Sequence, residues 1–114
     1  MVLGASLNPD RYSHKAVIEL RSKGHEVIAI GLREGQIADV NIIKELPEII
    51  VDTITLYLNP NRQTEFYNYI ISCKPKRVIF NPGTENFELI ELLEREGVKC
   101  EIACTLVMLS IGNY

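Results

Sequence analysis

The chain has 114 residues and a mass of 12.9 kDa, enough for one hydrophobic core but too little for separate cofactor and catalytic domains. The formal net charge of −3 argues against nucleic acid or an anionic membrane as an electrostatic partner. Three cysteines without framework spacing indicate a reducing compartment, and we expect the cytoplasm. No apolar tract is long enough to predict a signal peptide or a membrane span.

In the first half of the chain, extended and helical patterns alternate. The expected elements are a strand over 1–3, a loop over 4–12, a helix over 13–23 and a strand over 26–30. Ser13 is expected to cap the helix and Gly24 to end it. Further on, Ile37 and 40–43 fit a short edge strand, and 46–48 fits a turn or a single helical turn.

The second half continues the alternation. It predicts a strand over 53–58, a helix opened by Asn59 and Pro60, a strand over 78–80, a leucine-rich helix ended by Gly97, and a strand over 99–103. The apolar tail 105–111 fits a last half-turn or an interface strip. Apolar strands between helices predict an α/β fold, with a doubly wound parallel sheet between two helical layers in a single domain over 1–114.

In such a sheet the ligand binds beyond the carboxyl ends of the strands, where the strand order reverses. Four loops are expected to leave those ends, over 4–12, 31–35, 59–62 and 81–86. All four are rich in Gly, Asn, Pro or Arg. The loops therefore indicate the same edge as the topology.

The first of these loops carries the strongest binding signal. The dinucleotide fingerprint needs three glycines and only Gly4 is present, so a standard nicotinamide or flavin site loses support. The loop is nevertheless longer than a strand-to-helix turn needs. Ser6, Asn8, Arg11 and Ser13 offer donors for phosphate oxygens at the positive end of a helix. The alternative is a turn with no ligand.

For each of the other three loops, the sequence is compatible with a ligand-binding role and with a purely structural one. Arg33 after the second strand suits a phosphorylated ribose better than a bare one, or it is a solvated arginine beside Glu34. Arg62 contacts a phosphate or pairs with Glu65, and pairing is slightly favoured. The turn at 81–83 meets an amide of a ligand or is purely structural.

Residues for catalysis or metal binding are not grouped in a known pattern. Cys100 and Cys104 would lie about 13 Å apart on an extended strand, beyond disulfide reach, and Cys73 falls on an apolar helical stripe. His14 and His25 show no ligand spacing. We therefore predict no catalytic residue and no metal site.

Three runs of sequence carry a resemblance: Gly4–Ser13, Asn81–Asn86 and Ala103–Leu109. Together they resemble the stand-alone CoA-binding domain proteins, small Rossmann-type proteins similar to the N-terminal nucleotide domain of the succinyl-CoA synthetase α subunit. The resemblance implies a parallel sheet of five or slightly more strands, with the diphosphate of CoA on the Gly-Ala-Ser loop. The synthetase's catalytic histidine domain has no counterpart, so ligase activity is not implied.

The resemblance also implies a set of binding residues. The phosphates would be held by the first loop, at Gly4, Ala5, Ser6, Asn8, Arg11 and Ser13, and Tyr12 of the same loop would also bind the ligand. The adenosine would meet Gly31, Leu32 and Arg33, and the rest of the ligand would be bordered by Asn59, Arg62, Asn81, Pro82 and Gly83.

We therefore predict a protein that binds CoA or an acyl-CoA and is non-catalytic, or at most catalytic together with a partner. One alternative is an NADP-type oxidoreductase subunit or redox sensor. Another is an interaction protein with a vestigial site, whose apolar strip 106–111 docks a partner, for example in a homodimer.

Overall fold

The computed structural model describes all 114 residues and contains one seven-stranded sheet with the strand order β3-β4-β2-β1-β5-β6-β7. The strands are β1 (Val2–Leu3), β2 (Ala29–Ile30), β3 (Gly35–Ile37), β4 (Val40–Ile43), β5 (Thr53–Leu56), β6 (Arg77–Phe80) and β7 (Lys99–Ile102). Every neighbouring pair is parallel except β3 and β4, which form an antiparallel hairpin at one edge.

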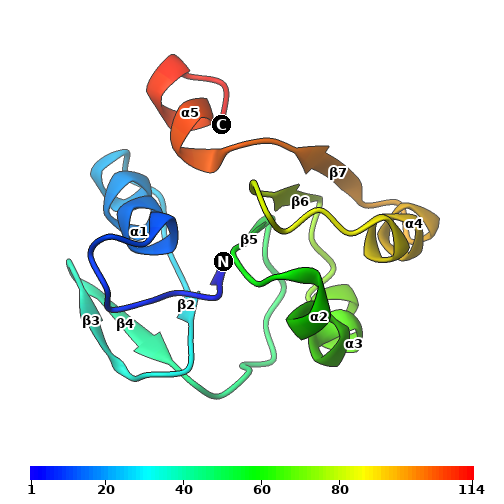
Figure 1. Cartoon of the computed structure of the whole chain (residues 1–114), viewed down its shortest axis with the longest axis horizontal. Coiled ribbons are helices and arrows are strands. Elements are labelled where there is room, and N and C mark those ends of the chain that lie inside the picture. The colour runs from blue at the N-terminus through cyan, green and yellow to red at the C-terminus, as the bar shows by residue number, and fades with distance from the viewer.

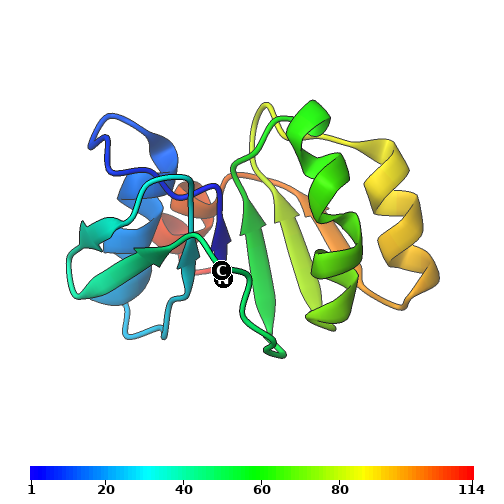
Figure 2. The same ribbon diagram turned by 90° about the horizontal axis from the view of Figure 1, so that it is seen from below.

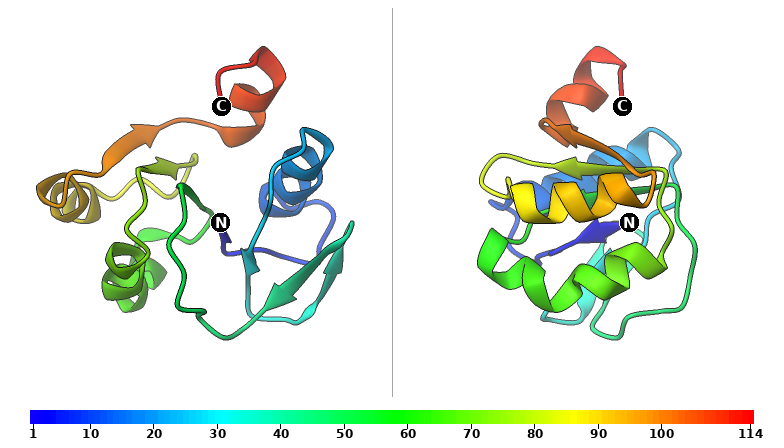
Figure 3. Two further views of the ribbon diagram at one scale, coloured as in Figure 1. Left: turned by 180° about the vertical axis from the view of Figure 1, so that it is seen from behind. Right: turned by 90° about the vertical axis from the view of Figure 1, so that its right-hand side faces the viewer.

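Helices cover both faces of the sheet. They are α1 (Tyr12–Ser22), α2 (Pro60–Gln63), the 3-10 turn η1 (Thr64–Phe66), α3 (Tyr67–Ser72), α4 (Phe87–Arg95) and α5 (Thr105–Ile111). Figure 1 shows α1 and α5 together on one face and α2, α3 and α4 on the other. In the right-hand view of Figure 3, α3 and α4 lie side by side across the sheet.

Two apolar clusters fill the spaces between these layers. On one face, Ile70 of α3 and Leu89 and Leu93 of α4 pack against β5 and β6. On the other, Val17 of α1 and Leu109 of α5 pack against strands β1, β2 and β4. Because the central strands contact helices on both faces, most of their side chains are apolar. In β5 and β6, the exceptions are Thr53, Thr55 and Arg77. The predicted three-layer, doubly wound α/β fold is confirmed.

The strand order reverses at β1. Leu3 is in register with Ile30 of β2 on one side and with Leu56 of β5 on the other. The loops that follow β1, β5 and β6 rise from the same edge of the sheet, and both chain termini lie at the opposite edge (Figure 2). This geometry places the expected crevice beyond β1 and β5.

Some element boundaries differ from the predictions. β2 contains only Ala29 and Ile30, so most of the strand predicted over 26–30 lies outside the sheet. The first helix starts one residue earlier than expected. Arg11 is its N-cap and makes no side-chain cap bond, so the prediction that Ser13 caps it is wrong.

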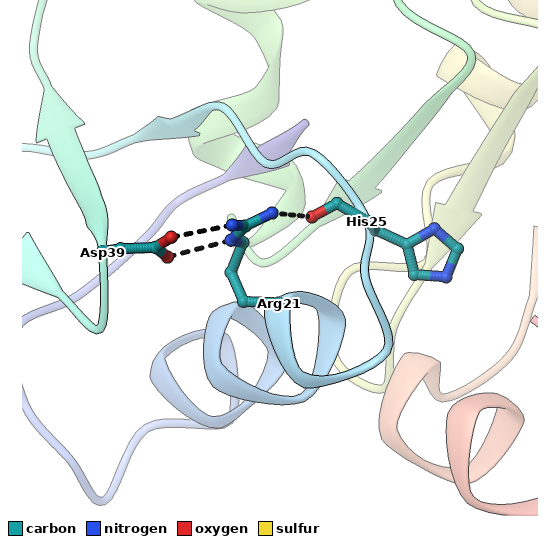
Figure 4. A network of polar contacts seen from close by, with 3 residues as sticks. All are labelled: Arg21, His25 and Asp39. Atoms are coloured by element: carbon teal, nitrogen blue, oxygen red, sulfur yellow. Dashed lines mark hydrogen bonds and ion pairs between the residues drawn. The ribbon is translucent and has the colours of Figure 1, made fainter.

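The edge strand predicted from Ile37 and 40–43 is divided between two strands. Residues 40–43 form β4, and Ile37 lies in β3, which pairs with the outer side of β4 and forms the edge. An ion pair fixes the hairpin to α1 (Figure 4). Arg21 donates two hydrogen bonds to the carboxylate of Asp39, at 2.9 and 2.7 Å, and a third to the carbonyl oxygen of His25 at 2.7 Å. This pair connects the end of α1, the loop before β2 and the hairpin turn.

Two other ambiguous segments are now assigned. Residues 46–48 form neither a turn nor a helix and belong to an irregular connection to β5. The apolar tail forms α5, which packs on α1, and its Leu109 belongs to the same buried cluster as Val17 and Leu20 of α1. None of the helices combines the length and the hydrophobicity that a membrane span requires.

Candidate functional site

The loop after β1 crosses the end of β2. Gly4 turns the chain with a φ of +99°, and the N–H groups of Gly4 and Ala5 both donate to the carbonyl oxygen of Ile30, at 2.9 and 2.8 Å. A Cβ on Gly31 would fall well inside contact distance of the Ala5 carbonyl oxygen. Glycine is therefore required at 31 because another segment of backbone passes over it.

The remaining loop amides divide into two groups. Asn8 donates its N–H to Ser6 Oγ at 3.1 Å, Asp10 to Asn8 Oδ1 at 3.0 Å, and Arg11 to the carbonyl oxygen of Asn8 at 3.0 Å. The amides that form no hydrogen bond within the chain are those of Ser6, Leu7, Tyr12 and Ser13. The last two are the first N–H groups of α1, where the helix dipole is positive.

The loop is also anchored to the helix that follows it. Nδ1 of His14 lies 2.9 Å from the carbonyl oxygen of Ser6, so an Nδ1–H tautomer donates to this oxygen. The Ser6 hydroxyl accepts one bond but retains its own proton to donate. The amide NH₂ of Asn8 forms no bond in the chain. These two groups are free donors on a restrained loop.

The arginines differ in whether their side chains have a partner within the chain. Of the six arginines in the sequence, four interact with a neighbour: Arg21 with Asp39, Arg62 with Glu65, Arg77 with Thr53 and Arg95 with Glu91.

Arg11 and Arg33 are both exposed and form neither an ion pair nor a side-chain hydrogen bond. For Arg33 this state agrees with both interpretations, a donor to a phosphorylated ribose and a solvated arginine beside Glu34. Both free guanidinium groups therefore lie on loops at the carboxyl edge, after β1 and β2. Leu32, beside Arg33, is 65% exposed. Its side chain is therefore accessible to the base of a ligand.

The loop after β5 opens α2 as the sequence predicts. Asn59 caps the helix by accepting from the N–H of Arg62 at 3.1 Å, and Pro60 is the first helical residue. Arg62 lies 3.8 Å from Glu65. The favoured interpretation of Arg62 as a pairing residue is therefore supported.

A buried glutamine joins this loop to the loop after β6. Gln63 donates to the carbonyl oxygens of Leu58 and Thr84, both at 2.8 Å, and its Oε1 accepts from Asn86 at 2.9 Å. The side chain is fully buried. The sequence analysis missed Gln63, since a glutamine one turn into a helix carries no signal of burial.

Asn81 holds the start of α5. Its Nδ2 donates to Thr55 Oγ1 at 2.7 Å and to the Leu56 carbonyl oxygen at 2.8 Å, while Oδ1 accepts from the Thr105 N–H at 2.9 Å. Only 2% of Asn81 is exposed. Its side chain is thus used within the fold, whereas Pro82 and Gly83 of the same turn are exposed.

Tyr57, at the end of β5, points its hydroxyl into this same region. The hydroxyl is buried without a hydrogen-bond partner, because the neighbouring hydroxyls of Thr55 and Thr105 bond to each other at 2.7 Å. Burial raises the pKa of Tyr57 to about 12, although the two threonines oppose the shift. Tyr57 is therefore neutral at physiological pH.

A cavity lies at the opposite, amino edge of the sheet. It has a volume of about 680 Å³ and is lined mainly by apolar residues around the starts of β1, β2 and β5. Its cation Arg77 is stacked on the ring of Tyr114 at 4.6 Å and bonded to Thr53. This cavity and the free cationic donors thus lie at different edges of the sheet. An anionic ligand is expected to bind at the edge that carries the donors.

The chain matches a known family over almost its whole length. The model of the CoA binding domain matches residues 1–110. The chain belongs to the CoA binding domain family. No curated protein matches it. Within this CoA binding domain, no group of three or more His, Cys, Asp or Glu side chains is placed to hold a metal ion.

Solved structures resemble this CoA binding domain as well. A crystal structure of an uncharacterized protein is 51% identical, with a TM-score of 0.94, and the match covers 99% of this chain and 94% of the other. A protein of Thermus thermophilus is 19% identical, with a TM-score of 0.86 and coverage of 99% and 87%. A conserved hypothetical protein of Pyrococcus furiosus is 29% identical, with a TM-score of 0.73 and coverage of 88% of each chain.

Proposed function

We propose that this protein binds coenzyme A at the carboxyl edge of the sheet, as one binding domain over 1–114. The observation that carries the proposal is that Arg11 and Arg33, alone among the arginines, have no partner within the chain, and both lie on loops that end at this edge. CoA carries a diphosphate and a 3′-phosphate. Two separate cations therefore match its two separate anionic groups.

The diphosphate would lie at the start of α1. There the free amides of Tyr12 and Ser13 combine with the free amides of Ser6 and Leu7, and Arg11 supplies a guanidinium group. Backbone N–H groups at a helix N-terminus bind phosphate well because they also carry the positive end of the helix dipole. Gly4 and Ala5 contribute through their small size, since their amides are bonded to Ile30.

The 3′-phosphate and the adenosine would lie beyond β2. Arg33 offers a bidentate donor for the phosphate, and the exposed Leu32 offers an apolar surface for the base. The pantetheine arm would then extend across β1 toward Asn59, Arg62, Pro82 and Gly83. Gln63 holds these last loops in a fixed relation to each other.

We infer binding without catalysis of its own. The edge presents donors and backbone, while His14 is bonded to the loop and Tyr57 is protonated and buried. No nucleophile is paired there with a base. The donors would thus hold and orient the ligand.

Native mass spectrometry of the purified protein, followed by calorimetry with CoA and with NADP, tests this function. We expect a CoA-sized adduct, or binding of added CoA that weakens with salt because the contacts are ionic. Binding of NADP in preference to CoA would contradict the proposal. A matched titration with pantetheine, which lacks the phosphates, is expected to give little binding.

A further inference from the structure

Strand β7 leaves one side of its backbone unpaired. It is the last strand of the sheet, with β6 as its only neighbour. The N–H of Lys99 donates toward β6, to the carbonyl oxygen of Lys76, at 3.0 Å. Because backbone groups alternate along a strand, the N–H and C=O groups of Cys100 and Ile102 point away from β6. They are available to a further strand.

We propose that β7 pairs in antiparallel fashion with β7 of a second copy of this chain, with the two-fold axis at Cys100. The two Cys100 residues would exchange N–H and C=O groups. The outward N–H of Ile102 would meet the carbonyl oxygen of Val98 in the other copy. Two seven-stranded sheets would then form one continuous sheet.

The charges on β7 select this register. Lys99 and Glu101 lie on the same face of the strand, with Nζ and Oε1 3.0 Å apart. With the axis at Cys100, each lysine lies opposite the glutamate of the other copy. A shift by two residues preserves the backbone pattern but places Lys99 opposite Lys99, or Glu101 opposite Glu101. Like charges directly opposite destabilise a strand pair, so of these three registers only the one at Cys100 is self-complementary.

Apolar side chains lie on the other face of the same edge. Cys100 and Ile102 are in register with Val78 and Phe80, which face the helices α3 and α4. Ile102 is 55% exposed. Figure 1 shows β7 at the outer end of the sheet, with α4 beside it.

An edge strand without proline or a bulge, with exposed apolar residues, is a template for pairing. Pairing would cover Ile102 on both copies. A lysine on an edge strand usually prevents pairing with another strand. Here Glu101 of the other copy would lie opposite Lys99, so the two charges would attract each other.

Charge reversal with light-scattering mass measurement tests the pairing. The wild-type chain is expected at twice 12.9 kDa. Glu101→Lys and Lys99→Glu are each expected at the monomer mass, because each places like charges opposite one another. The double exchange K99E/E101K restores opposite charges and is expected to restore the dimer. Glu45→Lys, an exposed reversal remote from β7, serves as the matched control and is expected to remain dimeric.

A monomeric wild-type chain would overturn the proposal. So would a dimer that survives both single reversals, or a double exchange that stays monomeric while its circular dichroism shows the native fold.

Oxidative cross-linking of the unmodified chain gives an independent measurement. In the proposed register the Cys100 Cα atoms would be about 5.5 Å apart, within the range of a disulfide. Burial and the nearby charge of Glu94 raise the pKa of Cys100 to about 11, so the reaction is run at alkaline pH. A covalent dimer that is lost in Cys100→Ser but retained in Cys104→Ser supports the register. A covalent dimer retained in Cys100→Ser contradicts it.

Discussion

The backbone of Ala5 passes directly over Gly31, so closely that no side chain fits between them. This contact sets the height of the β1 loop above the end of β2. It also determines where the free amides of Ser6 and Leu7 lie. The proposed phosphate site therefore depends on a glycine that belongs to a different loop.

Gly31→Ala is expected to destabilise the fold by about 3 kcal/mol, the upper end of the range for overpacking, because the added methyl group meets backbone. It should also weaken CoA binding, since the loop must move. Urea unfolding and calorimetry measure the two effects.

Gly35→Ala is the control for this change. There the added methyl group would meet the end of the Leu7 side chain, at 2.6 Å, which can rotate away. We expect a cost of about 1 kcal/mol or less. Equal losses in the two variants would contradict the role assigned to Gly31.

Arg11→Ala is expected to weaken CoA binding by about 1.5 to 3 kcal/mol, or about 10- to 150-fold, because a charge-assisted bond to phosphate is lost. Arg95→Ala removes an equal charge from α4, far from the proposed site, and should leave the affinity unchanged. Calorimetric titration of both variants measures the difference. An unchanged affinity in Arg11→Ala would remove this residue from the site.

Arg33→Ala is expected to discriminate between CoA and dephospho-CoA, which lacks the 3′-phosphate. If Arg33 contacts that phosphate, the variant binds CoA about tenfold or more weakly but binds dephospho-CoA as the wild-type chain does. An equal loss for both ligands would show that Arg33 contacts another part of the molecule.

The order of strands and helices, and the edge that carries the free donors, could be predicted from the sequence. Apolar strands that alternate with capped helices leave few topologies. The start of a helix at Asn59-Pro60 and the end of a helix at Gly97 depend only on neighbouring residues, so the sequence predicts both correctly. The short extent of β2 was not, because Val27 and Ile28 are β-branched whether or not a neighbouring strand pairs with them.

Several roles within the site could not be predicted because they depend on contacts distant in sequence. Gly31 is constrained by Ala5, and Asn81 by Thr105, through packing that no local pattern reveals. Ser13 looked like a cap because serine is a common cap, but the chain enters α1 one residue earlier. Free and bonded arginines likewise look identical until their neighbours are known.

Asn81→Ala is expected to destabilise the protein by about 3 kcal/mol, because it leaves the buried Thr105 N–H and the Leu56 carbonyl oxygen without partners. Asn59→Ala removes an exposed helix cap and should cost about 1 kcal/mol. Chemical unfolding of both variants provides the comparison. Equal costs would indicate that water replaces the lost bonds at Asn81.

The Arg21–Asp39 pair makes a prediction about pH. The hydrogen bonds from Arg21 lower the pKa of Asp39 from its ordinary value of 3.8. A carboxyl group with a lowered folded-state pKa stabilises the protein above the unfolded-state value, and this contribution is lost as the pH falls through the folded-state value. Asp39→Asn should therefore lower the melting temperature at neutral pH and have progressively less effect below pH 3.8.

Glu91→Gln is the control for Asp39→Asn. It disrupts the exposed i,i+4 pair with Arg95, which lies within one helix and joins no separate elements. We expect a smaller change in melting temperature. A loss in Asp39→Asn that is independent of pH would indicate that packing, rather than charge, holds the hairpin to α1.

The most direct measurement is an NMR titration of the ¹⁵N-labelled protein with CoA, which reports where the ligand contacts the chain. We expect the largest amide shifts at Ser6, Leu7, Tyr12 and Ser13, followed by Leu32 and Arg33. Shifts concentrated instead around Val27, Ile50 and Tyr114, which line the large cavity at the amino edge, would contradict a CoA site at the carboxyl edge.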